Sequence, residues 1–139
     1  MQIDPRGPRS AAALTTLVLA AALITASWPL PAAQAVVFAL GALGRSPYGW
    51  LYRVLLRPRL GPPTELEDAR PPRFAQLVGL LFAVPAALGY LLGANWLGTA
   101  ACACALAAAF LNAAFGYCLG CEVYLLLRRG QARFAVTGR

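Results

Sequence analysis

The residues of this chain with the greatest chemical potential lie near its C-terminus. Cys118 and Cys121 form a C-x-x-C motif, and Glu122 follows it directly inside a long apolar run. An acid buried in a membrane is costly, so it is a functional hypothesis by default, although Glu122 could instead pair with a nearby Arg. On one helix these three residues share a side. The spacing therefore predicts one site, with Cys118, Cys121 and Glu122 as its catalytic candidates.

This motif is compatible with three roles, and the sequence leaves them open. The cysteines could exchange between dithiol and disulfide, hold a soft metal ion, or simply pack as small apolar side chains. A metal site would be incomplete, because the chain has no His and because Cys102 and Cys104 would lie ~20 Å away along a straight helix. We therefore assign no metal ligands, and the cofactor stays unknown. Whether the protein is an enzyme stays undecided.

The position of the motif along its helix bears on redox chemistry. In a continuous helix the pair would lie near the C-terminal, negative end and beside a carboxylate, and both features oppose a thiolate. A helix break at Gly116 or Gly120 would remove that objection. The alternative function is a non-catalytic membrane subunit or small carrier in which the cysteines only pack.

The composition places the chain in a membrane. Of 139 residues, 60% are hydrophobic and only 12% are charged, about half the charged share of a soluble domain. There is no His and no Lys. This excludes Ser-His-Asp triads, His-ligated haem and Schiff-base chemistry through Lys.

The basic residues are distributed as in a multi-pass membrane protein. The net charge of +7 could suggest nucleic-acid binding, but all 12 basic residues are Arg and they cluster outside the apolar runs. Residues 10–44 and 74–121 carry no charge. The positive-inside rule then predicts that the Arg-rich segments are cytoplasmic, and we expect no nucleic-acid partner.

The apolar runs predict an all-α, integral membrane four-helix bundle formed by one domain, residues 1–139. The expected spans are 11–28, 31–48, 74–92 and 96–127, with a cytoplasmic loop at 57–73. Both termini would be cytoplasmic in a bacterial inner membrane. The last run is longer than a span needs, so it should tilt, break between Asn112 and Gly120, or follow the interface. A cleaved signal peptide ending at Ala35 is the alternative for the first span.

An internal repeat organises the chain. Residues 4–9 and 68–73 both read D-x-R-x-P-R before an apolar run, and Gly44 later corresponds to Gly116 at an offset of 72. Two hairpins in the same orientation would form a parallel repeat. The motif suits the start of a helix, with Pro in the first turn. A pair of anion sites is the alternative, so Arg70, Arg73 and Asn112 are weak binding candidates. Glu65, Glu67 and Asp68 are expected to pair with Arg residues of the loop.

Small residues recur along two of the apolar runs. Gly89 and Gly93 form one GxxxG motif, and Gly116 and Gly120 form another. Such stripes allow helices to approach closely. They could support packing within the chain or an oligomer.

Three segments carry a resemblance to a known family. IDPRGPR, RPRLGPPTELEDARPPRFAQ and FLNAAFGYCLGCEVYLLLRR resemble the bacterial membrane family labelled domain of unknown function 4395. The resemblance implies four helices and a cytoplasmic-side motif at Cys118, Gly120, Cys121 and Glu122. Family members are often found near thioredoxin-like and sulfurtransferase proteins. The resemblance thus favours thiol-redox or sulfur-compound handling, with a thioredoxin-like or sulfurtransferase protein as partner.

Overall fold

The protein is helical apart from two very short strands. The computed structural model describes residues 2–62, 66–68 and 70–137. The predominance of helices among these residues confirms the predicted helical class. The elements in chain order are β1 (Gln2–Ile3), α1 (Arg6–Thr25), α2 (Pro29–Ala42), α3 (Pro47–Leu51), the π-helical turn η1 (Tyr52–Leu56), α4 (Arg57–Leu60), β2 (Glu67–Asp68), α5 (Arg70–Leu91), α6 (Asn95–Phe115) and α7 (Leu119–Thr137).

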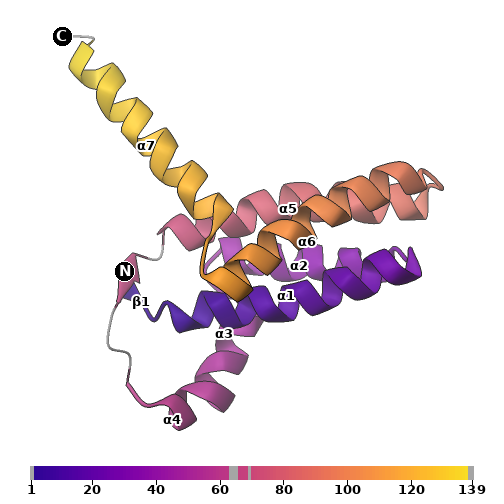
Figure 1. The fold of residues 1–139 in the computed structure, drawn as a ribbon, viewed down its shortest axis with the longest axis horizontal. Helices are drawn as coiled ribbons and strands as arrows, with labels where there is room; N and C mark the ends of the chain where they lie inside the picture. Colours follow the sequence, from indigo (N-terminus) through magenta and orange to yellow (C-terminus); the bar gives the residue numbers. More distant parts are fainter. Residues whose placement is uncertain (1, 63–65, 69, 138–139) are drawn as a thin grey trace.

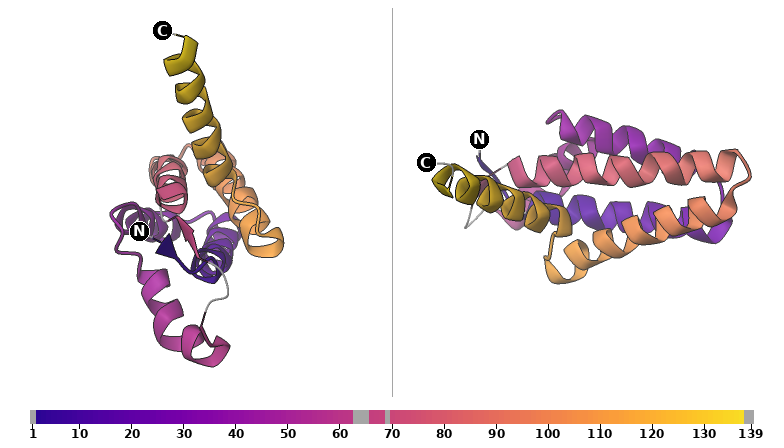
Figure 2. Two further views of the ribbon diagram at one scale, coloured as in Figure 1. Left: turned by 90° about the vertical axis from the view of Figure 1, so that its left-hand side faces the viewer. Right: turned by 90° about the horizontal axis from the view of Figure 1, so that it is seen from above.

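Four of these helices lie side by side, and the others leave one end of the group. The helix α2 packs against α5, α1 packs against α6, and α5 also contacts α6 (Figure 1). The α1–α2 and α5–α6 turns lie together at one end, as two views agree (Figure 2). The chain start, α3, α4 and α7 lie toward the opposite end. The Arg-bearing segments are therefore separated from the uncharged turns.

Three helices among the described residues are long and apolar enough to cross a membrane. They are α1, α5 and α6, whereas α2 is apolar but has only 14 residues. Large apolar side chains such as Ile24, Leu81 and Trp96 are exposed on the outside of the molecule. An apolar exterior fits a protein surrounded by lipid.

Two of the expected spans are interrupted. The run 31–48 stops being helical after Ala42, where Gly44 adopts a φ of 84°, and a new helix begins at Pro47. The run 96–127 is divided between α6 and α7 by Gly116, which has a φ of 69°. A positive φ is readily accessible only to glycine, so these two residues end their helices.

The helices that follow the D-x-R-x-P-R motifs begin earlier than the apolar runs do. The helix α1 begins at Arg6 and the helix α5 at Arg70, with proline in the first turn of each. The predicted loop 57–73 therefore includes α4 and the first turn of α5. The predicted pairing of Glu65, Glu67 and Asp68 concerns a residue and side chains outside the described part of the chain.

The buried core lies toward the end with the uncharged turns. Leu19 and Ala22 of α1 pack there with Ala86 of α5 and Cys102 of α6. The Cys102 thiol is fully buried and donates a hydrogen bond to the carbonyl oxygen of Leu19 at 3.3 Å.

Candidate active site at the start of α7

The helix break at Gly116 determines where the C-x-x-C motif lies. The Gly116 N–H donates to the carbonyl of Asn112 at 2.9 Å, and the Tyr117 N–H donates to Leu111 at 3.3 Å. These bonds satisfy the last carbonyls of α6. Cys118 consequently lies immediately before α7, at the positive end of a new helix. The electrostatic objection that a continuous helix would raise does not apply to this geometry.

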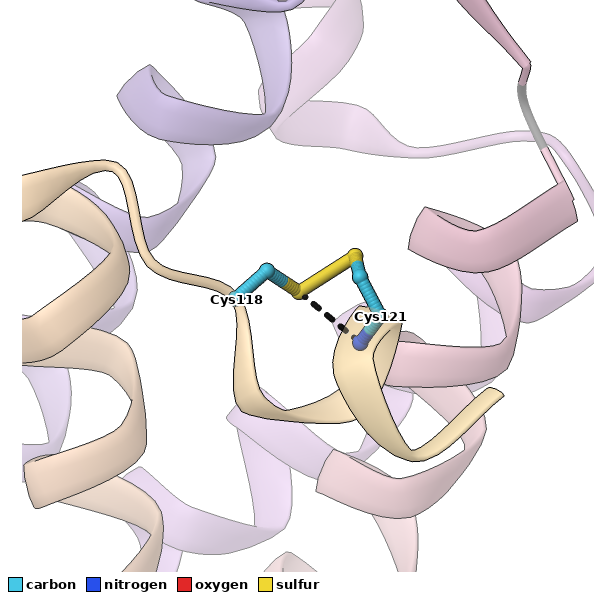
Figure 3. Close-up of a disulfide and its surroundings, with 2 residues drawn as sticks. All are labelled: Cys118 and Cys121. Atoms are coloured by element: carbon cyan, nitrogen blue, oxygen red, sulfur yellow. Dashed lines mark hydrogen bonds between the residues drawn. A yellow bond between two sulfur atoms is a disulfide. The ribbon is translucent and has the colours of Figure 1, made fainter. Parts of the chain in front are cut away.

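Cys118 and Cys121 form a disulfide across the first turn of α7 (Figure 3). Their Cα atoms are 5.2 Å apart. The Cys121 N–H donates to the Cys118 sulfur at 3.2 Å, and the Glu122 N–H donates to the Cys118 carbonyl at 3.0 Å. A thiolate at Cys118 would accept the same N–H bond at a helix N-terminus. This is the environment that stabilises reactive thiolates in proteins.

The disulfide borders a cavity of about 460 Å³. Its walls come from α1, α5 and α6 with Phe38 of α2, and the first turn of α7 completes them. Most of the lining is apolar and includes Phe38 and Phe82. Its polar side chains are those of Arg9, Thr15, Gln76 and Asn112.

The sequence-predicted site residues are not all brought together. Cys118, Cys121 and Asn112 line the cavity, and all three are half-buried. Glu122 is exposed on α7 and is not among the lining residues. Arg70 begins α5 and is exposed outside the cavity.

Arg73 contacts a helix end. Its Nε donates to the carbonyl oxygen of Ala42 at 3.3 Å, beside Gly44. Arg9 makes the corresponding contact, since its guanidinium donates to Ala113 at 3.3 Å beside Gly116. A cation is favourable at the negative C-terminus of a helix. In this geometry both guanidinium groups cap helices.

The lining residues that sequence reasoning missed include Arg9, Gln76 and Cys104. Arg9 could have been found as the counterpart of Arg73 in the D-x-R-x-P-R motif. Cys104 lines the same cavity as Cys118 because the break at Gly116 turns the chain back toward the other helices. Among the described residues, no group of three His, Cys, Asp or Glu side chains could hold a metal ion.

The glycines of the two GxxxG motifs are used within the chain. Gly89 lies against the backbone of Gly98, and Gly120 lies against Ala75 of α5. Gly93 and Gly116 both have a positive φ, each just after a helix. The close approach at Gly120 seats the first turn of α7 on α5, which holds the disulfide beside the cavity.

Two polar networks support the Arg-bearing end. The buried Gln34 amide donates to Thr15 at 3.1 Å and accepts from the Tyr48 hydroxyl at 2.9 Å. Asp4 forms an ion pair with Arg6 at 2.9 Å and accepts from the Tyr52 hydroxyl at 2.6 Å. The hydrogen bonds from Arg6, chiefly, lower the pKa of Asp4 to about 2 despite partial burial. These contacts tie α3 to α1 through Gln34 of α2, and η1 to the residues just before α1.

Comparison with known proteins identifies a family whose model matches this chain. The family model described as "Domain of unknown function (DUF4395)" matches residues 3–129, which include both cysteines of the disulfide. No curated protein and no solved structure matches the chain significantly.

Proposed function

The chain belongs to the DUF4395 family, and we propose that it is a multi-pass membrane protein that exchanges dithiol for disulfide through Cys118 and Cys121. One observation carries this proposal. The two cysteines are bonded to each other on the first turn of a helix, with a backbone N–H on the Cys118 sulfur and a cavity beside them. A pair used only for packing needs neither feature.

The exchange would follow ordinary thiol–disulfide chemistry. A thiolate of a dithiol partner attacks the Cys118 sulfur, the Cys118–Cys121 bond breaks, and Cys121 leaves as a thiolate that takes up a proton. The partner's second thiolate then attacks the partner sulfur that is bonded to Cys118 in the mixed disulfide. Cys118 leaves as a thiolate, stabilised by the Cys121 N–H and the start of α7, and is protonated in turn. The pair gains two electrons and two protons, and the partner becomes a disulfide.

The proposed topology has four spans with both termini on the cytoplasmic side of a bacterial inner membrane. The separation of Arg-bearing segments from uncharged turns supports this orientation. The Cys118–Cys121 pair would then face the cytoplasmic half of the bilayer. A thioredoxin-like protein is the partner whose chemistry fits, because it supplies two thiols at one exposed site.

We also propose that the two halves of the domain are parallel repeats that form a four-helix bundle. Antiparallel pairing of β1 and β2 sets Ile3 opposite Glu67, its own counterpart at an offset of 64. The packing of α2 on α5 and of α1 on α6 would be equivalent contacts in such a repeat. The matching caps formed by Arg9 and Arg73 support the same relation.

The redox proposal can be tested on the purified full chain. Oxidised protein is mixed with reduced thioredoxin as a probe, and free thiols are counted by gel shift with a maleimide polymer. We expect two new thiols in the protein, and a mixed disulfide trapped at Cys118 when the thioredoxin probe lacks its second active-site cysteine. The matched control is Cys102→Ser, because Cys102 is fully buried away from the cavity. If Cys118→Ser exchanges as well as wild type, or retains full function in cells, the cysteines only pack.

A further inference from the structure

We propose that the cavity beside Cys118 and Cys121 binds the ring of a lipid-soluble quinone, which reoxidises the dithiol. This inference rests on the proposed function, since it names the electron acceptor of the same pair. A dithiol that has taken electrons from a soluble partner must pass them on before it can act again. An acceptor dissolved in the bilayer can reach a site inside a membrane protein.

The size and lining of the cavity suit a flat apolar ligand. Its volume of about 460 Å³ lies within the usual range for small-molecule sites. Phe38 and Phe82 contribute aromatic surface, and the small side chains of Ala108 and Ala109 leave room beside α6. A small inorganic anion would leave most of this apolar surface without contact.

The polar side chains of the cavity suit carbonyl oxygens. Asn112 and Gln76 each carry an amide with two N–H donors. Arg9 uses one guanidinium nitrogen on the carbonyl of Ala113, and a guanidinium has five N–H donors in all. Among the described lining residues Arg9 alone is charged. A neutral ring with carbonyl groups therefore fits better than a dianion.

The position of Cys104 gives the cavity a lateral opening. Its side chain lines the cavity and yet is exposed, in the middle of a helix apolar enough to cross a membrane. The cavity is therefore open beside Cys104. A lipophilic molecule could pass from the bilayer to the disulfide by this route.

The reaction balances without a further reagent. The two thiols of Cys118 and Cys121 lose two electrons and two protons, two S–H bonds break, and one S–S bond forms. The quinone gains the same two electrons and two protons, which form two O–H bonds on its ring. Quinol leaves and the disulfide is ready for the next dithiol partner.

Binding can be measured separately from electron transfer. In a Cys102→Ser/Cys118→Ser/Cys121→Ser variant, Cys104 is the one remaining thiol. Decylubiquinone, whose substituted ring does not readily add thiols, should slow its alkylation by N-ethylmaleimide about tenfold or more at saturation. The control carries Ala107→Cys with Cys104→Ser, because Ala107 is exposed and does not line the cavity. Equal protection of both thiols, or of neither, would overturn the proposed site.

Electron transfer is measured as quinol formed by the reduced protein. The variant Ala108→Val/Ala109→Val narrows the cavity. It uses the residues that α2 has at an offset of 72, which are Val36 and Val37. It should raise the KM for quinone at least several-fold. Ala107→Val is its control. Normal thioredoxin exchange without quinol formation would refute the quinone inference and leave the proposed function intact. Protection of Cys104 without any exchange at Cys118 would refute both, leaving a site for a ligand that is not an oxidant.

Discussion

The two halves of the chain place different atoms in the same local geometry. At an offset of 72, Ser46 corresponds to Cys118 and Gly49 to Cys121. Ser46 caps α3 by accepting the Gly49 N–H on its hydroxyl at 3.2 Å, and Cys118 accepts the Cys121 N–H on its sulfur at the same distance. The first half uses this turn to start a helix. In the second half the same turn could also stabilise a thiolate, so the difference lies in side-chain chemistry rather than in the backbone.

The halves also differ in how their interiors are filled. The first half buries Gln34 between Thr15 and Tyr48. At the same offset, Leu106 corresponds to Gln34 and Gly120 to Tyr48. The second half thus has no large hydroxyl-bearing ring at this point, and Gly120 instead borders the cavity, which residues of both halves line. The cysteine pair of the second half therefore borders the cavity, whereas the corresponding turn at Ser46 does not line it.

The largest expected effect comes from moving the cysteine pair between halves. Ser46→Cys/Gly49→Cys, in a chain with Cys118→Ser/Cys121→Ser, should form a disulfide. A Cβ at Gly49 would lie 3.4 Å from the Ser46 Cβ, close to normal disulfide geometry. Quinol formation should still fall by roughly 100-fold or more, because this turn does not line the cavity. Recovery of quinol formation by the moved pair would show that the cavity is unnecessary.

A smaller effect is expected when the interior of the first half is made to resemble the second. Gln34→Leu leaves the Thr15 and Tyr48 hydroxyls without their buried partner, which should lower the free energy of unfolding by about 1–2 kcal/mol. Adding Thr15→Val and Tyr48→Phe should recover part of that loss, because no polar partner then stays unpaired. Thermal unfolding in detergent measures both. No recovery in the triple variant would mean that shape, not hydrogen bonding, dominates here.

The two capping arginines should have equal effects on stability and unequal effects on activity. Arg9→Gln and Arg73→Gln should each lower the free energy of unfolding by about 0.3–1 kcal/mol, since each removes a cation from a helix C-terminus. Only Arg9 lines the cavity, so only Arg9→Gln should raise the KM for quinone. Equal KM values in the two variants would argue against a role for Arg9 in binding.

The smallest effect concerns acid. The pKa of Asp4 falls from an ordinary 3.8 to about 2 in the folded chain, mainly through its hydrogen bonds with Arg6. Its stabilising contribution is therefore complete above pH 3.8 and is lost as the pH falls toward 2. An ion pair close to solvent contributes about 0–1 kcal/mol. Acid titrations of wild type and Asp4→Asn should differ above pH 3.8 and converge near pH 2.

The sequence predicted part of this structure because the relevant forces are local. Long uncharged runs predicted the apolar helices, and the motifs around Cys118 predicted the family. The division of the last run at Gly116 could be narrowed to nine residues but not located, because Gly116 and Gly120 could each end a helix there. The cavity depends on how α1, α5 and α6 meet, so its lining by Arg9 and Cys104 could not be inferred from spacing alone. The exposed position of Glu122 depends on that break as well.

The shortness of α2 has a consequence for the lipid around the protein. Its 14 residues extend ~21 Å, while the 22 residues of α5 extend ~33 Å. The hydrocarbon layer is about 30 Å thick, so a bilayer that fits α5 is too thick for α2. In the proposed four-span topology the membrane must thin beside α2, at a fraction of a kcal/mol for each ångström of mismatch. Lipids with short acyl chains should therefore gather on that side, and the protein should be more stable in thin bilayers than in thick ones.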